Sequence, residues 1–154
     1  MGNEGKTEFQ VKDLIVTALL AVCALAIYMV CAILSFSPYT MLAVSPLWAL
    51  LAGITYFLVA VRTKKSWALF VFCALTGVHG LYVPMIVCCL IAGVIAATLA
   101  SKTSCTNERA LTASYVVYMV LAAFGGMYVP FLFFSQQTLT QYSTQFGEDY
   151  MQLL

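Results

Sequence analysis

Charged and apolar positions are segregated into long blocks along this chain. The seven Lys and Arg residues fall into three groups: the N-terminal tail (Lys6, Lys12), a first loop (Arg62, Lys64, Lys65) and a second loop (Lys102, Arg109). The uncharged blocks between and after them are Leu14 to Val61, Ser66 to Ser101 and Ala110 to Gly147. A bilayer core needs roughly 20 apolar helical residues per crossing, so the first two blocks are long enough to cross and return. The pattern predicts an all-α, polytopic membrane helix bundle with five transmembrane helices.

These five helices are expected over about 12–34, 39–61, 66–81, 83–101 and 109–134 in a single membrane domain, 1–154, that ends in a polar tail over 135–154. The polar turn that ends at Pro38 separates the first two helices, because proline opens helices well. Pro46 predicts a kink near the outer end of the second helix, since it removes one backbone hydrogen bond.

The basic groups also predict an orientation. An even number of crossings separates each group from the next, so all three groups fall on the same side, and basic loops stay in the cytoplasm. We therefore expect a multi-pass protein of the cell membrane with its N-terminus in the cytoplasm and its C-terminus outside. These residues could also touch anionic lipid headgroups or a cytoplasmic partner.

Composition supports the membrane assignment independently. Hydrophobic residues make up 63% of the chain and charged residues 8%, and the mean hydropathy is +0.96; a water-soluble domain of this size could not bury so much apolar surface. A net charge of +1 argues against a nucleic-acid partner. Membrane lipid is the partner that the composition predicts.

The third and fourth helices offer the best candidates for a solute site. Their block gives only about 15 to 18 residues per arm, and it breaks around Gly77 and Pro84. Non-helical backbone at membrane depth is tolerated only inside protein or beside water, which makes the outer end a candidate ligand-facing surface. The substrate-binding candidates are His79, Tyr82, Tyr128 and Trp48.

Each of these candidates also has a structural explanation. His79, the only ionisable side chain in the three blocks apart from tyrosine and cysteine, could simply be hydrated at the turn. Aromatic belts at the membrane interfaces account for many of the tyrosines and tryptophans. Tyr82 and Tyr128 are the stronger candidates among the aromatic residues, because they lie close to glycine and proline residues that interrupt the helices. For Tyr128 these residues are Gly125, Gly126 and Pro130.

Residue types that the apolar blocks lack exclude several classes of function. The blocks hold no Asp, Glu, Lys or Arg, so the relay of a proton-coupled transporter and the paired acids of an intramembrane hydrolase are absent. No phosphate-binding G-x-x-x-x-G-K-[ST] loop occurs. We therefore expect no enzyme activity, no catalytic residues and no cofactor, and any uphill transport needs energy from another subunit. The six cysteines lack metal-ligand spacing and are interpreted as packing residues.

Small side chains form a stripe along the first helix, where they permit close approach of another helix. The stripe can serve a partner protein, or it can serve packing within the chain. Its members are Thr17, Ala18, Ala21 and Ala24.

Three segments of the chain resemble a known family. They are Lys-Asp-Leu-Ile with the following Thr-Ala-Leu (Lys12 to Leu19), Pro-Leu-Trp-Ala-Leu-Leu-Ala-Gly (Pro46 to Gly53), and the Gly/His/Pro hairpin that enters Cys-Cys-Leu-Ile-Ala-Gly (Cys88 to Gly93). Together they resemble the MptD-type, or Trep/Strep, integral membrane family, described as substrate-binding S components of energy-coupling factor (ECF) transporters. The resemblance extends from Val11 to Leu154.

This resemblance implies a bacterial membrane subunit that takes up a small vitamin-like or heterocyclic solute from outside. Its implied partners are a membrane-embedded coupling (T) subunit, which S components often meet through an A-x-x-x-A pattern on helix one, and two cytoplasmic ATPases. The fold usually has six spans, so this chain would be an S-component-like bundle that lacks a sixth helix. The alternative function is a small membrane adaptor or assembly subunit without a solute site.

Overall fold

The structure is a computed structural model, and it describes residues 10–33, 38–78, 83–102, 105, 107–133 and 140. Within these residues the elements are α1 (Val11–Ile33), α2 (Pro38–Thr63), α3 (Ser66–Val78), α4 (Val83–Ser101), α5 (Glu108–Ala123), the π-helix η1 (Phe124–Tyr128) and α6 (Val129–Phe133). The prediction of an all-α membrane helix bundle is confirmed. The predicted starts of the five helices agree with α1 to α5 to within a residue.

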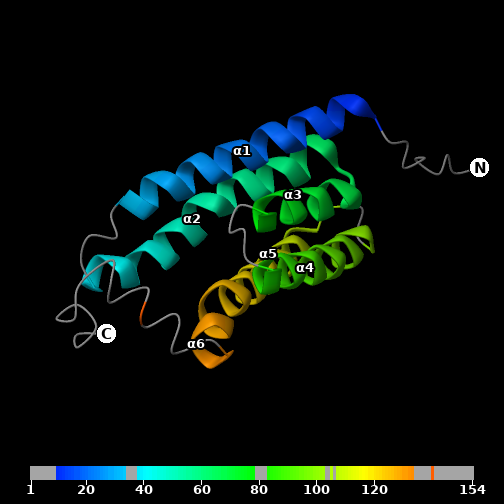
Figure 1. Cartoon of the computed structure of the whole chain (residues 1–154). Helices are drawn as coiled ribbons and strands as arrows, with labels where there is room; N and C mark the ends of the chain where they lie inside the picture. The colour runs from blue at the N-terminus through cyan, green and yellow to red at the C-terminus, as the bar shows by residue number, and fades with distance from the viewer. Residues whose placement is uncertain are drawn as a thin grey trace, which may run out of the picture.

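The helices pack as successive antiparallel neighbours (Figure 1). α1 lies along α2, α3 pairs with α4, and α5 packs against α4 and also contacts α2, while α1 also contacts α3. The start of α1, the turn between α2 and α3 and the end of α4 lie at one end of the bundle (Figure 1). Lys12, Arg62, Lys64, Lys65 and Lys102 belong to these segments, Arg109 lies at the start of α5 that follows, and we call this end the basic end.

Local backbone bonds set the helix ends on the basic side. Lys64 takes a left-handed conformation (φ 53°), and its N–H donates to the carbonyl of Ala60 at 2.9 Å, which closes α2 with the cap that glycine more often provides. Cys105 is also left-handed (φ 56°), and its N–H donates to the carbonyl of Ala100, five residues earlier, at 3.1 Å, which caps the end of α4. Asn107 then caps α5, where its side chain accepts from the N–H of Arg109 at 3.0 Å.

Helix length divides the bundle into two classes. In the described residues, four helical stretches are long and apolar enough to cross a membrane: Val11–Ile33, Pro46–Thr63, Val83–Ser101 and Glu108–Gly126. α3 has 13 residues, which is about 20 Å of helix against a bilayer core of about 30 Å. The sequence predicted a short third helix over about 66–81, and the described α3 covers Ser66–Val78 of that range.

Cysteine and glycine hold the middle helices close together. A Cβ added at Gly93 would lie 3.1 Å from Cys73 Cβ, and one added at Gly77 would lie 2.6 Å from Cys89 Cβ. Each helix of the α3–α4 pair thus carries Cys followed four residues later by Gly, and in antiparallel packing each Cys fits against the partner's Gly. Such small contacts let membrane helices approach closely. The expected packing role of these cysteines is confirmed.

A third contact of this kind lies between α4 and η1. A Cβ at Gly125 would come within 2.7 Å of Cys88 Cβ, and Gly125 is buried. The π-turn agrees with the sequence, because Pro130 has no backbone N–H to donate, while the N–H of Val129 donates to the carbonyl of Phe124. The loosened backbone predicted near Gly125 and Pro130 is confirmed. The backbone around Gly125 packs against α4.

Candidate functional site

Four hydroxyl groups meet in the centre of the bundle, among side chains that are at most 1% exposed. Tyr56 Oη lies 2.9 Å from Ser114 Oγ, and Tyr118 Oη lies 2.8 Å from Thr76 Oγ1. Ser114 donates its own proton to the Leu111 carbonyl, and Thr76 donates to Phe72 and Cys73. Each hydroxyl has one proton to give, so both tyrosines are the donors in these pairs.

Aromatic rings surround these hydroxyls. Tyr56 and Tyr118 stack with their ring centroids 5.9 Å apart and an angle of 10° between their planes, and Phe72 meets Tyr56 edge-on at 5.8 Å. Tyr115 lies against Gly53, where an added Cβ would touch the ring at 3.3 Å, and its hydroxyl donates to the Ala49 carbonyl. We call Tyr56, Phe72, Thr76, Ser114, Tyr115 and Tyr118 the central cluster. It joins α2, α3 and α5.

The sequence analysis missed the central cluster. Ser114, Tyr115 and Tyr118 lie within one turn of α5, and Gly53 with Tyr56 lies within one turn of α2. Polar residues clustered within one turn of an otherwise apolar segment are a recognisable pattern, because a hydroxyl in lipid needs a partner. Which hydroxyl pairs with which depends on which helices are neighbours in the fold. The cluster fills its own volume and satisfies its own hydroxyls, so its role is to join the helices.

Of the predicted solute residues, the structure describes Trp48 and Tyr128. Trp48 is half-buried and meets Tyr28 of α1 edge-on, with 5.8 Å between ring centroids. Tyr128 lies in η1, is 61% exposed and stacks on Phe124 at 6.3 Å. His79 and Tyr82 lie outside the described residues. The solute role of these four residues stays a prediction.

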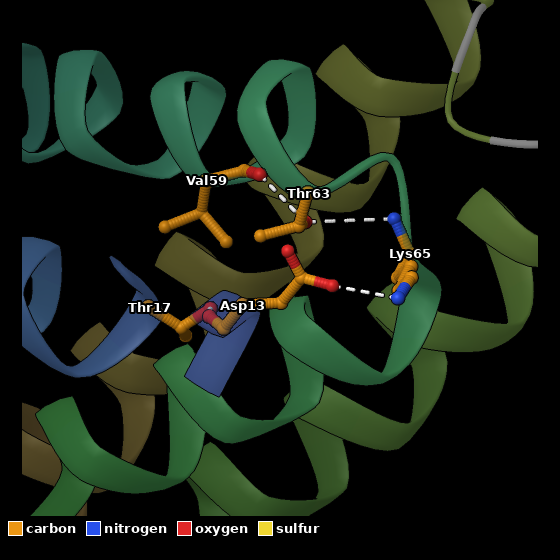
Figure 2. A network of polar contacts seen from close by, with 5 residues as sticks. All are labelled: Asp13, Thr17, Val59, Thr63 and Lys65. Carbon is orange, nitrogen blue, oxygen red and sulfur yellow. Dashed lines mark hydrogen bonds and ion pairs between the residues drawn. The ribbon is translucent and has the colours of Figure 1, made fainter. Parts of the chain in front are cut away.

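An ion pair ties three segments together at the basic end. Asp13 Oδ2 lies 2.6 Å from Lys65 Nζ, and both side chains are 17% exposed. Figure 2 shows the carboxylate of Asp13 between Thr63 and Lys65, with Thr17 beside it on α1. Thr63 donates to the Val59 carbonyl at 2.7 Å, and Thr17 donates to the Asp13 carbonyl at 2.8 Å. We call the Asp13–Lys65 pair the clasp. It holds the start of α1 against the α2–α3 turn.

The family of the chain follows from a comparison with known families. The model of a family described as hypothetical bacterial integral membrane protein (Trep_Strep) matches residues 11–154. The chain belongs to the Trep_Strep family. No curated protein matches it, and no solved structure does. Membership agrees with the apolar helices of the structure, and it confirms that this Trep_Strep protein is a bacterial integral membrane protein that contacts lipid.

The small-residue stripe of this Trep_Strep chain faces its own bundle. Thr17 is fully buried, and Ala21 and Ala24 are each 1% exposed, because α1 packs against both α2 and α3. Packing within the chain, one of the two explanations left open by the sequence, therefore applies to these three residues. Ala18 is half-buried at the edge of the stripe. A docking role for the stripe stays a prediction, and Ala18 is its member nearest the surface.

A surface depression at the start of α5 is lined by residues of that helix alone: Glu108, Arg109, Thr112, Ala113, Val116 and Val117. Binding sites for small molecules are enclosed by several elements. We therefore assign no function to this depression.

Proposed function

We propose that this Trep_Strep protein is the substrate-binding S component of an ECF-type ABC importer for a small vitamin-like or heterocyclic solute. In this proposal a coupling subunit and two cytoplasmic ATPases supply the energy. The observation that carries the proposal is the difference in length between α3 and the helices beside it.

This difference can be measured from the central cluster. Tyr56 of α2 and Phe72 of α3 are in ring contact, with centroids 5.8 Å apart, and so give a common reference point from which the two helices can be measured. From Tyr56 back to its start at Pro38, α2 extends about 27 Å, whereas α3 extends about 9 Å from Phe72 to its end at Val78. α2 therefore continues about 18 Å past the end of α3.

The end of α3 is therefore the floor that we propose for the solute site. Trp48 belongs to the part of α2 beyond that floor, and Tyr128 belongs to η1, which begins where Gly125 meets the first turns of α4. His79 and Tyr82 lie in the sequence that links α3 to α4. Aromatic faces with one imidazole suit a planar heterocycle, which can stack and accept or donate a few hydrogen bonds.

The energy requirement supports separate ATPases. The blocks Leu14 to Val61, Ser66 to Ser101 and Ala110 to Gly147 contain no Asp, Glu, Lys or Arg, and the chain has no phosphate-binding loop. Import against a gradient needs coupling to ATP, to an ion or to a proton, and intramembrane charges usually carry the last two. A binding subunit driven by partner ATPases agrees with this composition.

Solute binding can be tested with the two tryptophans as a matched pair. The purified protein is heated with vitamins, purines and indoles, since a ligand selective for the folded state adds RT ln(1 + [L]/Kd) to stability. We expect one class to raise the melting temperature. Trp48→Phe and the His79→Ala/Tyr82→Ala double variant should weaken that effect, and Trp67→Phe at the basic end should not. Equal binding by all of these variants would refute the site.

One observation favours the adaptor alternative. The central cluster is filled by its own side chains, so the middle of the described bundle is built for helix packing. An adaptor without a solute site predicts no stabilisation by any solute of the panel and normal association with its membrane partners.

A further inference from the structure

The exposed cations of the basic end are divided between two corners. Asp13 and Lys65 join the start of α1 to the α2–α3 turn, which brings together the two segments that carry Lys12, Arg62 and Lys64, and all three side chains are exposed. We call Lys12, Arg62 and Lys64 the clasp corner. The other corner, formed by the α4–α5 loop, carries Lys102 and Arg109, with the exposed carboxylate of Glu108 next to Arg109.

The two corners present different net charges. Asp13 is largely buried and engaged with Lys65 at 2.6 Å, so it is satisfied inside the protein, while the three neighbouring cations point to the surface. In the second corner, Glu108 is exposed and offsets part of the positive charge. The clasp corner is therefore the stronger positive site of the described basic end. Its cations lie at the ends of the apolar helices α1 and α2.

We propose that the clasp corner binds the phosphate of an anionic phospholipid. A basic cluster next to a membrane helix attracts anionic headgroups electrostatically. The guanidinium of Arg62 can bind phosphate oxygens in a bidentate manner, and the ammonium groups of Lys12 and Lys64 add point charges. A headgroup fits better than a soluble anion, because its acyl chains can lie against the apolar residues Val11, Ile15 and Val61, which are 64%, 62% and 62% exposed.

Trp67 provides a local readout. It is the second residue of α3, it lies two residues after Lys65, and Trp48 is the other tryptophan of the chain. In a Trp48→Phe background, all tryptophan fluorescence therefore comes from the basic end. Phospholipids with brominated acyl chains quench tryptophan at short range, so quenching compares how often each lipid occupies the neighbourhood of Trp67.

The test reconstitutes this protein in membranes that contain brominated phosphatidylglycerol or brominated phosphatidylcholine at equal mole fraction. We expect phosphatidylglycerol to occupy the site about three- to tenfold more tightly and to lose that preference in high salt. Arg62→Gln/Lys64→Gln should remove most of the preference. Lys102→Gln/Arg109→Gln removes the same two residue types from the other corner and should leave it nearly unchanged.

Two results would overturn the proposal. Equal quenching by the two lipids would exclude an anionic-lipid site, and the clasp corner would then be free to meet an acidic protein surface. An equal loss of preference in both double variants would show a diffuse charge effect in place of a site at the clasp corner. Helix content and elution volume of each variant establish that the fold is intact, so a null result cannot arise from unfolding.

Discussion

At the scale of single residues, the bundle is held by small and hydroxyl side chains in contact with one another. The hydroxyls of Tyr56 and Tyr118 donate to Ser114 and Thr76, and those acceptors pass their own protons to helix carbonyls. Removing a donor leaves an acceptor that has lost one of its bonds, whereas removing an acceptor leaves a buried O–H without a partner. The second change costs more free energy.

This asymmetry gives a first prediction. Thr76→Val removes the acceptor of Tyr118 and should lower the free energy of unfolding by about 2 kcal/mol, and Tyr118→Phe should lower it by about 1 kcal/mol. The double variant should be little worse than Thr76→Val alone, because the pair acts as one unit. Unfolding in mixed micelles measures all three. If Tyr118→Phe proved the more harmful of the two single changes, the assignment of donor and acceptor would be wrong.

The Cys–Gly contacts give a second prediction. Gly77→Ala places its Cβ 2.6 Å from Cys89 Cβ, so α3 and α4 must move apart, at a cost of about 1–3 kcal/mol. Gly126→Ala is the control, because its Cβ would lie 3.5 Å from Met85 Sδ in ordinary contact. The melting temperature should fall for Gly77→Ala and stay nearly constant for Gly126→Ala. Adding Cys89→Gly to Gly77→Ala should recover part of the loss, and a lack of recovery would contradict the close contact.

At the scale of elements, the clasp decides how α1 joins the bundle. α1 is 23 residues long, and Asp13 lies in its first turn, where a carboxylate also favours the helix dipole. Lys65 lies between the left-handed cap at Lys64 and the first residue of α3. One ion pair thus fixes the start of the first helix against the turn between the next two.

A charge swap tests the clasp. Asp13→Lys alone should lower the free energy of unfolding by about 2–4 kcal/mol, because it places two ammonium groups together in a mostly buried position. Combining it with Lys65→Asp should restore part of the loss. Lys64→Gln, a change at the exposed neighbouring residue, should have little effect. A swap variant that is no more stable than Asp13→Lys would indicate that the pair does not hold α1.

At the scale of the whole molecule, the sequence predicts the helices better than their contacts. Charge blocks and proline positions place the starts of α1 to α5, because membrane depth imposes length and apolarity on each segment. They cannot predict that Thr17, Ala21 and Ala24 turn inward, since one apolar stripe looks like another when all faces are apolar. The central cluster escaped prediction because the pairing of its hydroxyls depends on which helices are neighbours. Trp48 and Tyr128 were identified as aromatic residues, and their ring partners Tyr28 and Phe124 were not.

The orientation of the bundle gives a prediction that the structure refines. Cys105 is a poor probe of sidedness, because it is 8% exposed and its burial raises the pKa of the thiol above the usual range, so little reactive thiolate forms. Lys102 is exposed in the same loop. With an impermeant thiol reagent, Lys102→Cys should be labelled in inside-out vesicles and Ser143→Cys in intact cells. Labelling of Lys102→Cys in intact cells would reverse the orientation.

The central claim is that this bundle binds its solute and leaves the use of ATP to partner subunits. The most direct measurement is purification of the tagged protein from the membranes of its own bacterium in mild detergent, with the stoichiometry of the retained proteins determined by mass spectrometry. The account predicts one coupling subunit and two ATPase subunits for each copy of this protein. Recovery of the protein without any ATPase, under conditions in which a known ECF complex stays intact, would contradict it.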